Sequence, residues 1–190
     1  MERGTAGRFI AGAGIGFASY GFTVLAVSLA AGPLHFTRSP TPAPGPIGVM
    51  ACTLLALSAM EELGFRGYPL RTLVRTIGTW RAQGIVAVAF GLSHVAFGWS
   101  VQTILLGVVP SALLFGAAAL AFRGLAAPIG LHAALNVARW AAGETEAPGF
   151  WTLTIDEATS GRVARMAPAI GVAVTLLCAL ALWRWKARAG

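Results

Sequence analysis

Six apolar stretches follow one another along this chain, and most of them approach the length of a membrane-spanning helix. A helix that crosses the hydrocarbon core of a bilayer needs about 20 mostly apolar residues. The sequence therefore predicts an all-α polytopic membrane bundle of about six transmembrane helices, the third and fifth being short. The stretches are Phe9–Ala31, Ile47–Phe65, Gln83–Trp99, Val101–Phe122, Leu125–Ala142 and Ala167–Trp185.

Composition excludes the main alternatives to a membrane protein. Hydrophobic residues make up 56% of the 190 residues and charged residues only 11%, whereas soluble domains carry roughly 25% charged residues. This composition excludes a water-soluble enzyme and a disordered chain. Cys52 and Cys178 both lie in apolar runs, which excludes a disulfide scaffold. We expect one domain, residues 1–190, with a motif-bearing core at about 47–142.

The basic residues predict the orientation of the helices. With a cytoplasmic N-terminus, most Lys and Arg fall in the inner segments, as the positive-inside rule requires. We therefore expect both termini to be cytoplasmic, in a multi-pass protein of the cell membrane. The net charge of +7 forms no basic patch with interleaved aromatic residues, so no nucleic-acid partner is expected. The inner residues are Arg3, Arg8, Arg71, Arg75, Arg81, Arg123, Arg184, Lys186 and Arg188, and the outer ones are Arg38, Arg162 and Arg165.

Two connecting segments differ in character. The alternate prolines of Ser39–Pro46 predict an extended, exposed linker. In the segment Tyr68–Arg81, Arg71 and Arg75 lie four residues apart, among the apolar residues Leu70, Leu73 and Val74. This pattern predicts a short basic amphipathic helix on the cytoplasmic leaflet, and a plain basic loop is an equal alternative.

Several further residues carry structural expectations. The spacing of Gly12 and Gly16 favours close helix packing, and it is only slight evidence for a homo-oligomer, which nothing else indicates. His35, two residues after Pro33 at the outer end of the first helix, is expected in a loop. Arg139 is expected to extend to the lipid headgroups.

Titratable side chains are rare within the apolar stretches. Glu61 and Glu62 lie near the end of the second stretch, His94 in the third and His132 in the fifth. Burying a carboxylate in hydrocarbon costs at least about 2.5 kcal/mol, so an intramembrane acid suggests a function. Counted from the cytoplasmic helix ends, Glu61, His94 and His132 lie roughly 10 to 16 Å deep at 1.5 Å per residue. Three helices are thus predicted to bring a carboxylate and two imidazoles into one layer.

The spacing within each helix adds detail to this cluster. Glu62 and Arg66 are four residues apart, so they share a helix face and can pair. Glu61 then lies about 100° away around the helix and can face another target. His132 and Asn136 are also four residues apart, which predicts an imidazole and an amide side by side in one cavity.

Two chemistries fit these residue types. A carboxylate can take a proton from water, while one histidine orients the water and the other, with an amide, stabilises an oxyanion. Alternatively, Glu61, His94 and His132 could be three zinc ligands with water in the fourth position. Both schemes lead to peptide-bond hydrolysis. Other protease classes fit poorly, because His-Glu-x-x-His is absent, the single Asp156 lies in a loop and Ser93 lies in no Gly-x-Ser-Gly turn.

Three motifs in this order resemble those of a known family. The resemblance is to the CPBP family of CAAX proteases and bacteriocin-processing enzymes, also called the Abi family. It covers roughly residues 60–136, and no motif position departs from the pattern. The motifs are Glu61-Glu62-Leu-Gly-Phe-Arg66, Phe90-Gly-Leu-Ser-His94 and His132-Ala-Ala-Leu-Asn136.

The resemblance implies a helical intramembrane endopeptidase. It implies that Glu61 activates water as the general base with help from His94, and that His132 and Asn136 stabilise the oxyanion. The family has been described both as metal-dependent and as metal-free, so no cofactor is certain and zinc is the alternative. The other charged residues of the first motif would shape and neutralise the site, namely Glu62 and Arg66.

The resemblance leaves the substrate and some alternatives open. The chain is rich in Ala, Gly and Arg, which is typical of proteins from high-GC bacteria, and we therefore expect it in a bacterial inner membrane. Prenylated substrates are not expected there. We expect a membrane-associated peptide or protein as the substrate and the lipid bilayer as a partner. The alternatives are a noncatalytic immunity or scaffold protein and an ion- or proton-coupled transporter. A transporter would usually show paired repeats or broken helices, which the sequence lacks.

Overall fold

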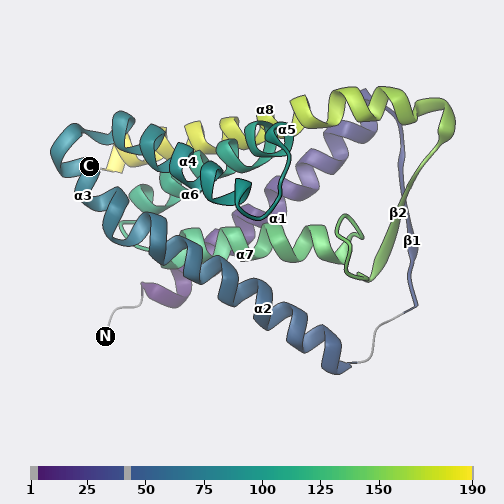
Figure 1. The fold of residues 1–190 in the computed structure, drawn as a ribbon, viewed down its shortest axis with the longest axis horizontal. Helices are drawn as coiled ribbons and strands as arrows, with labels where there is room; N and C mark the ends of the chain where they lie inside the picture. Colours follow the sequence, from purple (N-terminus) through teal and green to yellow (C-terminus); the bar gives the residue numbers. More distant parts are fainter. Residues whose placement is uncertain (1–3, 41–43, 190) are drawn as a thin grey trace.

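The computed structural model describes residues 4–40 and 44–189, and helices dominate it, which confirms the predicted all-α class (Figure 1). Two π-helical turns interrupt longer helices, so that α2, η1 and α3 are continuous, as are α5, η2 and α6. The elements are α1 Thr5–Ala30, β1 Leu34–Arg38, α2 Pro44–Glu62, η1 Leu63–Gly67, α3 Tyr68–Ile77, α4 Thr79–Val95, α5 Val101–Thr103, η2 Ile104–Val108, α6 Val109–Ala121, α7 Ala126–Ala141, β2 Trp151–Ile155 and α8 Glu157–Ala189.

All six predicted apolar stretches contain a helix, and four helical segments are long and apolar enough to cross a membrane. The helices α4 and α7, with 17 and 16 residues, are shorter. The membrane-type helical bundle is therefore confirmed, whereas the number of crossings and the side on which the termini lie stay predictions. The four long segments are Thr5–Ala30, Gly45–Ile77, Val101–Ala121 and Glu157–Trp185.

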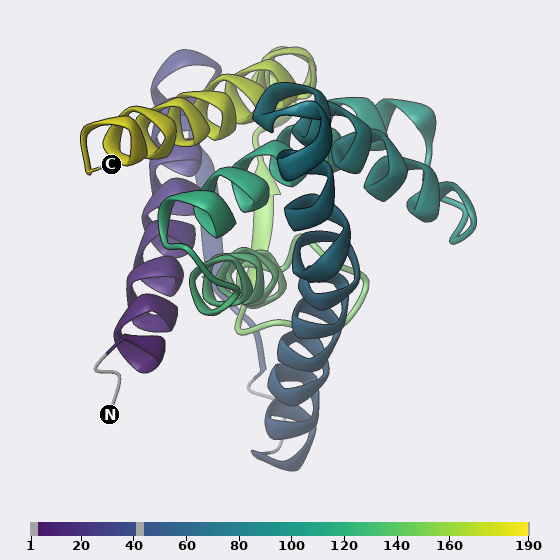
Figure 2. The same ribbon diagram turned by 90° about the vertical axis from the view of Figure 1, so that its left-hand side faces the viewer.

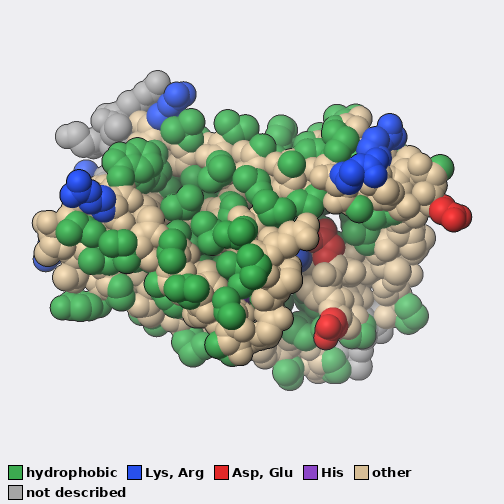
Figure 3. All heavy atoms as spheres, turned by 45° about the horizontal axis from the view of Figure 1, so that its top comes forward, with side chains coloured by type: hydrophobic (Ala, Val, Ile, Leu, Met, Phe, Trp, Pro, Cys, Tyr) green, Lys and Arg blue, Asp and Glu red, His purple; other side chains and the backbone are tan. Residues whose placement is uncertain are grey.

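The surface is that of a protein in contact with lipid. Large apolar side chains project outward, among them Ile10, Phe22 and Leu29, which is 79% exposed. Figure 3 shows hydrophobic side chains over much of one face, with basic groups gathered towards its two ends. Exposed apolar area on this scale would make a protein aggregate in water, and a bilayer removes that penalty.

The helix α7 lies in the middle of the bundle, where Figure 2 shows it end-on. It contacts α1, α2 and α6, and more than half of its residues are buried. Small side chains on this helix, such as Ala127, Gly130 and Ala134, let the neighbouring helices approach closely. A polar group on α7 is therefore placed in the interior of the bundle.

Glycines set the closest approach, between α1 and α7. A Cβ atom on Gly12 would overlap the carbonyl oxygen of Ala127, and a Cβ atom on Gly130 would overlap that of Phe9. Gly16 faces the carbonyl oxygen of Leu131 in the same way. The predicted close packing is confirmed, and the helix that packs against Gly12 and Gly16 is α7.

A two-stranded antiparallel sheet, which the sequence did not predict, joins β1 to β2 (Figure 1). Leu34 pairs with Ile155 and Arg38 with Trp151. The loop assignment of His35 is therefore wrong, because His35 belongs to β1, and its Nε2 lies 3.2 Å from Asp156 Oδ2. Strands paired across more than 100 residues leave no local periodicity that a sequence reading could detect.

Two other expectations need correction, and a third gains a detail. The helix α8 begins at Glu157, so Arg162 and Arg165 lie in a helix rather than in a loop. Pro44 begins α2, so the predicted linker is shorter, and its residues 41–43 lie outside the described residues, as do Arg3 and the side chains of Lys186 and Arg188. The guanidinium of Arg139 lies 3.3 Å from the Glu144 carboxylate and its side chain is half exposed, so its contact with lipid headgroups stays a prediction.

The amphipathic helix predicted within Tyr68–Arg81 is confirmed as α3. Its apolar residue Leu70 is fully buried against Ala82 and Val86 of α4, whereas Arg71 is exposed. Gly78 separates α3 from α4 with a φ of +82°, a left-handed conformation that glycine adopts without strain. The chain thus turns back, and α4 can pack beside α3.

Candidate active site

One face of α2 and its π-helical extension carries three fully buried polar residues, Ser58, Glu62 and Arg66. They recur every four residues, which places them on one side of a helix. Arg66 lies in η1, which begins directly after Glu62, and π-helical turns are frequent at functional sites. This face points towards α6 and α7, where its polar groups find their partners.

Glu62 and Arg66 form the ion pair that their spacing predicted. Arg66 Nη1 donates to Glu62 Oε1 at 3.1 Å, and Arg66 Nη2 donates to the carbonyl oxygen of Ala112 at 3.1 Å. The guanidinium carbon lies 4.4 Å from the centre of the Phe90 ring and 5.4 Å from that of Phe115. A buried charge requires such compensation. With Phe65 at 5.9 Å as a third ring, the arginine is fixed between one carboxylate, one carbonyl and three aromatic rings.

His132 of α7 lies between the two acidic residues. Its Nδ1 donates to Glu62 Oε1 at 3.0 Å, and its Nε2 lies 3.6 Å from Glu61 Oε2. The imidazole stacks on Phe115, with ring centres 4.2 Å apart and an interplanar angle of 18°. Because Nδ1 is held by Glu62, the ring is oriented and its Nε2 is directed towards Glu61.

Asn136, one turn beyond His132, is held by a residue that sequence reasoning missed. Its Nδ2 donates to Ser58 Oγ at 3.2 Å, and Ser58 Oγ donates to the carbonyl oxygen of Leu54 at 2.7 Å. The sequence did contain one signal, since Ser58 lies four residues before Glu62 and eight before Arg66. A polar residue in that repeat shares the face of the site.

His94 is separated from the acidic pair by an aromatic ring. Its Nδ1 donates to the carbonyl oxygen of Phe90 at 2.8 Å, and its ring packs edge-on against Trp99, with centres 4.9 Å apart. The Phe90 ring centre lies 4.7 Å from His94 and 6.2 Å from His132. Within the described part of the chain, no hydrogen bond or ion pair joins His94 to Glu61. The nearest imidazole to Glu61 is that of His132.

A cavity of about 430 Å³ connects these groups to the rest of the bundle. His94, His132 and Asn136 line it, whereas Glu61 is not among its lining residues and has 27% of its side chain exposed. Apolar residues of α1, β1, β2 and α8 form much of the remaining wall. Imidazole and amide groups thus face a largely apolar space that a substrate side chain could enter.

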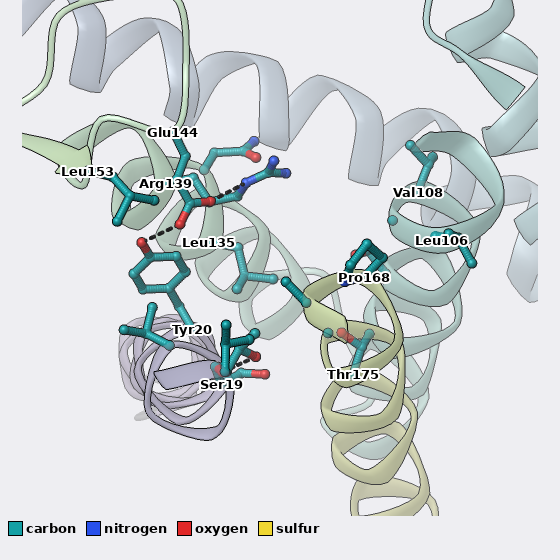
Figure 4. A pocket seen from close by; sticks show the side chains of 18 of the residues that line it. Ser19, Tyr20, Leu106, Val108, Leu135, Arg139, Glu144, Leu153, Pro168 and Thr175 are labelled. Atoms are coloured by element: carbon teal, nitrogen blue, oxygen red, sulfur yellow. Dashed lines mark hydrogen bonds and ion pairs between the residues drawn. The ribbon is translucent and has the colours of Figure 1, made fainter. Parts of the chain in front are cut away.

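A second polar group lines the same cavity and was not predicted as part of a site. Tyr20 of α1 donates its hydroxyl to Glu144 Oε1 at 2.7 Å, and Arg139 Nε donates to Glu144 Oε2 at 3.3 Å. Figure 4 shows Tyr20 and Arg139 reaching this carboxylate from two helices. Acidic side chains are visible in a hollow of the surface in Figure 3. No pattern in the sequence predicted the contact between Tyr20 and Glu144, since these residues are 124 apart in the chain.

A zinc site would require Glu61, His94 and His132 to bring their donor atoms together. Within residues 4–40 and 44–189, no three His, Cys, Asp or Glu side chains form a group that could hold a metal ion. Glu61 and His132 lie close enough to act together, but His94, the third predicted ligand, does not join them. The arrangement therefore does not fit the predicted three-ligand zinc site.

Comparison with known proteins bears on the same segment. No curated protein and no solved structure matches the chain. The profile of a family described as type II CAAX prenyl endopeptidase Rce1-like matches residues 43–138, which is half of the chain and includes every predicted site residue. The three motifs of this chain lie within the matched segment. The chain belongs to the Rce1-like family of CAAX endopeptidases.

Proposed function

We propose that this protein is an intramembrane endopeptidase that hydrolyses a peptide bond with a water molecule activated by Glu61. Membership of a protease family supports the reaction class. One observation carries the mechanism, namely that two adjacent acids meet a single buried arginine, so that one carboxylate is in excess. That excess carboxylate is Glu61, whose Oε2 lies 3.6 Å from His132 Nε2.

The two acids have different tasks in this proposal. Glu62 is fully buried, and its Oε1 accepts from both Arg66 and His132. It is therefore committed to holding its partners in place. Glu61 is partly exposed and pairs only loosely with His132, so its carboxylate can accept a proton from water.

The proposed reaction follows from these positions. Glu61 takes a proton from water, and the hydroxide oxygen forms a bond to the carbonyl carbon of the substrate. The resulting oxyanion accepts a hydrogen bond from Asn136, and from His132 when its Nε2 carries a proton, because the Nδ1–H of His132 is used by Glu62. These bonds supply the electrostatic stabilisation that acyl transfer requires. The peptide C–N bond then breaks as its nitrogen takes up the proton, with His94 orienting the water or passing the proton. The products are one carboxylic acid and one amine.

This proposal uses no metal ion, since the side chains in the described part of the chain do not offer three ligands together. The chelator arm of the assay below tests zinc as the alternative. We further propose a multi-pass protein of the cell membrane with both termini in the cytoplasm. The proposed substrate is a membrane-associated peptide or protein, because the cavity that His94 and His132 share is largely apolar.

The test is a proteolysis assay with purified protein in detergent and a library of quenched peptides. Wild type, Glu61→Gln and His94→Ala are compared with Glu146→Gln, a matched control that makes the same change at an exposed acid in the loop after α7. We expect cleavage by wild type and by Glu146→Gln, loss in the other two, and full activity in chelator. Equal background from all four folded proteins would overturn the endopeptidase proposal, and loss of wild-type activity in chelator would overturn its metal-free form.

A further inference from the structure

We infer that Ser58 is a positioning residue of this site, which sets the direction of the Asn136 amide for the oxyanion. The inference rests on the proposed endopeptidase function and adds to it a residue outside the three motifs. Ser58 is fully buried between α2 and α7, and its hydroxyl bridges two groups. A buried serine that only filled space would be replaceable by alanine.

The direction of the hydrogen bonds follows from counting hydrogens. A serine hydroxyl has one hydrogen, and Ser58 gives it to the carbonyl oxygen of Leu54 at 2.7 Å. Its oxygen can therefore only accept from Asn136. This fixes the Asn136 amide with its nitrogen towards Ser58, at 3.2 Å, independently of how the amide atoms themselves are assigned.

The consequence for the site concerns the other hydrogen of the amide. Asn136 Nδ2 carries two hydrogens, of which Ser58 uses one. Asn136 also lines the cavity that contains His94 and His132. A fixed amide can present its second N–H to an oxyanion without reorganising during the reaction, which is where such donors gain their effect.

Ser58 also sets the register between the two helices. Ser58 contacts Asn136, and Glu62 contacts His132. From the first contact to the second, the residue number rises by four on α2 and falls by four on α7. The two contacts lie one helical turn apart and define an antiparallel register. The Ser58–Asn136 hydrogen bond therefore supports the neighbouring Glu62–His132 contact, and a site built on two rigid helices keeps its geometry.

The experiment is a double-mutant cycle on purified protein, with the peptide that wild type cleaves best. The variants are Ser58→Ala, Asn136→Ala and the double variant, each measured for kcat, KM and melting temperature. We expect Ser58→Ala to lower kcat about tenfold with KM within about twofold, and Asn136→Ala to lower kcat about 100-fold. The double variant should be no slower than Asn136→Ala, because Ser58 acts only through the amide.

The control is Gln83→Met, which removes another buried polar contact between helices. Gln83 is 2% exposed and donates to the carbonyl oxygen of Leu113 across α4 and α6, away from the cavity. Its kcat should match that of wild type even if its melting temperature falls. If Ser58→Ala does not fold, Ser58→Cys, which is close to serine in size, takes its place in the cycle.

Each outcome has one meaning. A slowed Ser58 variant whose effect disappears in the Asn136→Ala background supports the positioning role. Independent effects, which would make the double variant about 1,000-fold slower than wild type, or an unchanged kcat in Ser58→Ala, would overturn it. Absence of cleavage by wild type would instead overturn the proposed function, so the two failures are distinguishable.

Discussion

Glu62 and His132 join α2 to α7 through a hydrogen bond of 3.0 Å, although 70 residues separate them in the chain. The same carboxylate oxygen accepts from Arg66 at 3.1 Å. Glu62 is thereby neutralised and immobilised, and it orients the imidazole that faces Glu61. Two adjacent acids in one motif thus occupy different environments, one fully buried and one partly exposed.

Because the two acids have different environments, replacing Glu61 by Gln should impair catalysis, whereas replacing Glu62 by Gln should impair stability. Glu61→Gln should lower kcat by about 100- to 10,000-fold, the range for loss of a general base, while the melting temperature stays within a few degrees of wild type. Glu62→Gln should lower the melting temperature, because it leaves the buried Arg66 without its counterion. Turnover assays and thermal unfolding in detergent measure the two effects. A Glu61→Gln protein with full activity would contradict the proposed mechanism.

Removing Arg66 alone should lower the stability of the protein more than removing both members of the ion pair. Arg66→Met leaves the Glu62 carboxylate in the interior without a cation, and breaking a buried pair in this way costs about 3–5 kcal/mol. The double variant Glu62→Gln with Arg66→Met buries no net charge, so it should recover part of the lost stability. Unfolding midpoints of the single and double variants provide the comparison. A double variant less stable than Arg66→Met would show that the charge balance is not the cause.

The glycine contact between α1 and α7 gives a prediction on stability alone. Gly12→Ala should destabilise the protein by about 1–3 kcal/mol, the usual penalty for overpacking, because the new Cβ would overlap the carbonyl oxygen of Ala127. Gly14→Ala is the matched control, since a Cβ there meets no atom within 4 Å. Light scattering on both variants should show the wild-type oligomeric state. A shift in that state for Gly12→Ala alone would mean that the glycine face also serves a second copy.

The proposed orientation can be tested by labelling single cysteines in intact cells. Cys52 and Cys178 are first replaced by alanine, and a cysteine is then placed at Thr154 of β2 or at Arg75 of α3, both near helix ends. A membrane-impermeant reagent should label Thr154→Cys from outside, whereas Arg75→Cys should react only after lysis. The reverse pattern would invert the topology, and it would leave the hydrolytic mechanism untouched.

The sequence alone determined the features that depend on neighbours along the chain. Apolar length predicted the helical class, because every backbone polar group in lipid must be satisfied within its own helix. The spacing of Glu62 and Arg66 predicted their pairing, because i and i+4 lie on one helix face whatever the tertiary structure. The basic face of α3 was predictable for the same reason.

Only the tertiary structure decided which groups meet across helices. It brought His132, and not His94, to the carboxylate of Glu61, because rotation and register between helices depend on packing over the whole bundle. It gave Asn136 a serine as its partner and joined β1 to β2 across more than 100 residues. Interhelical contacts of this kind leave no period in the sequence, since each depends on the approach that distant glycines and alanines allow.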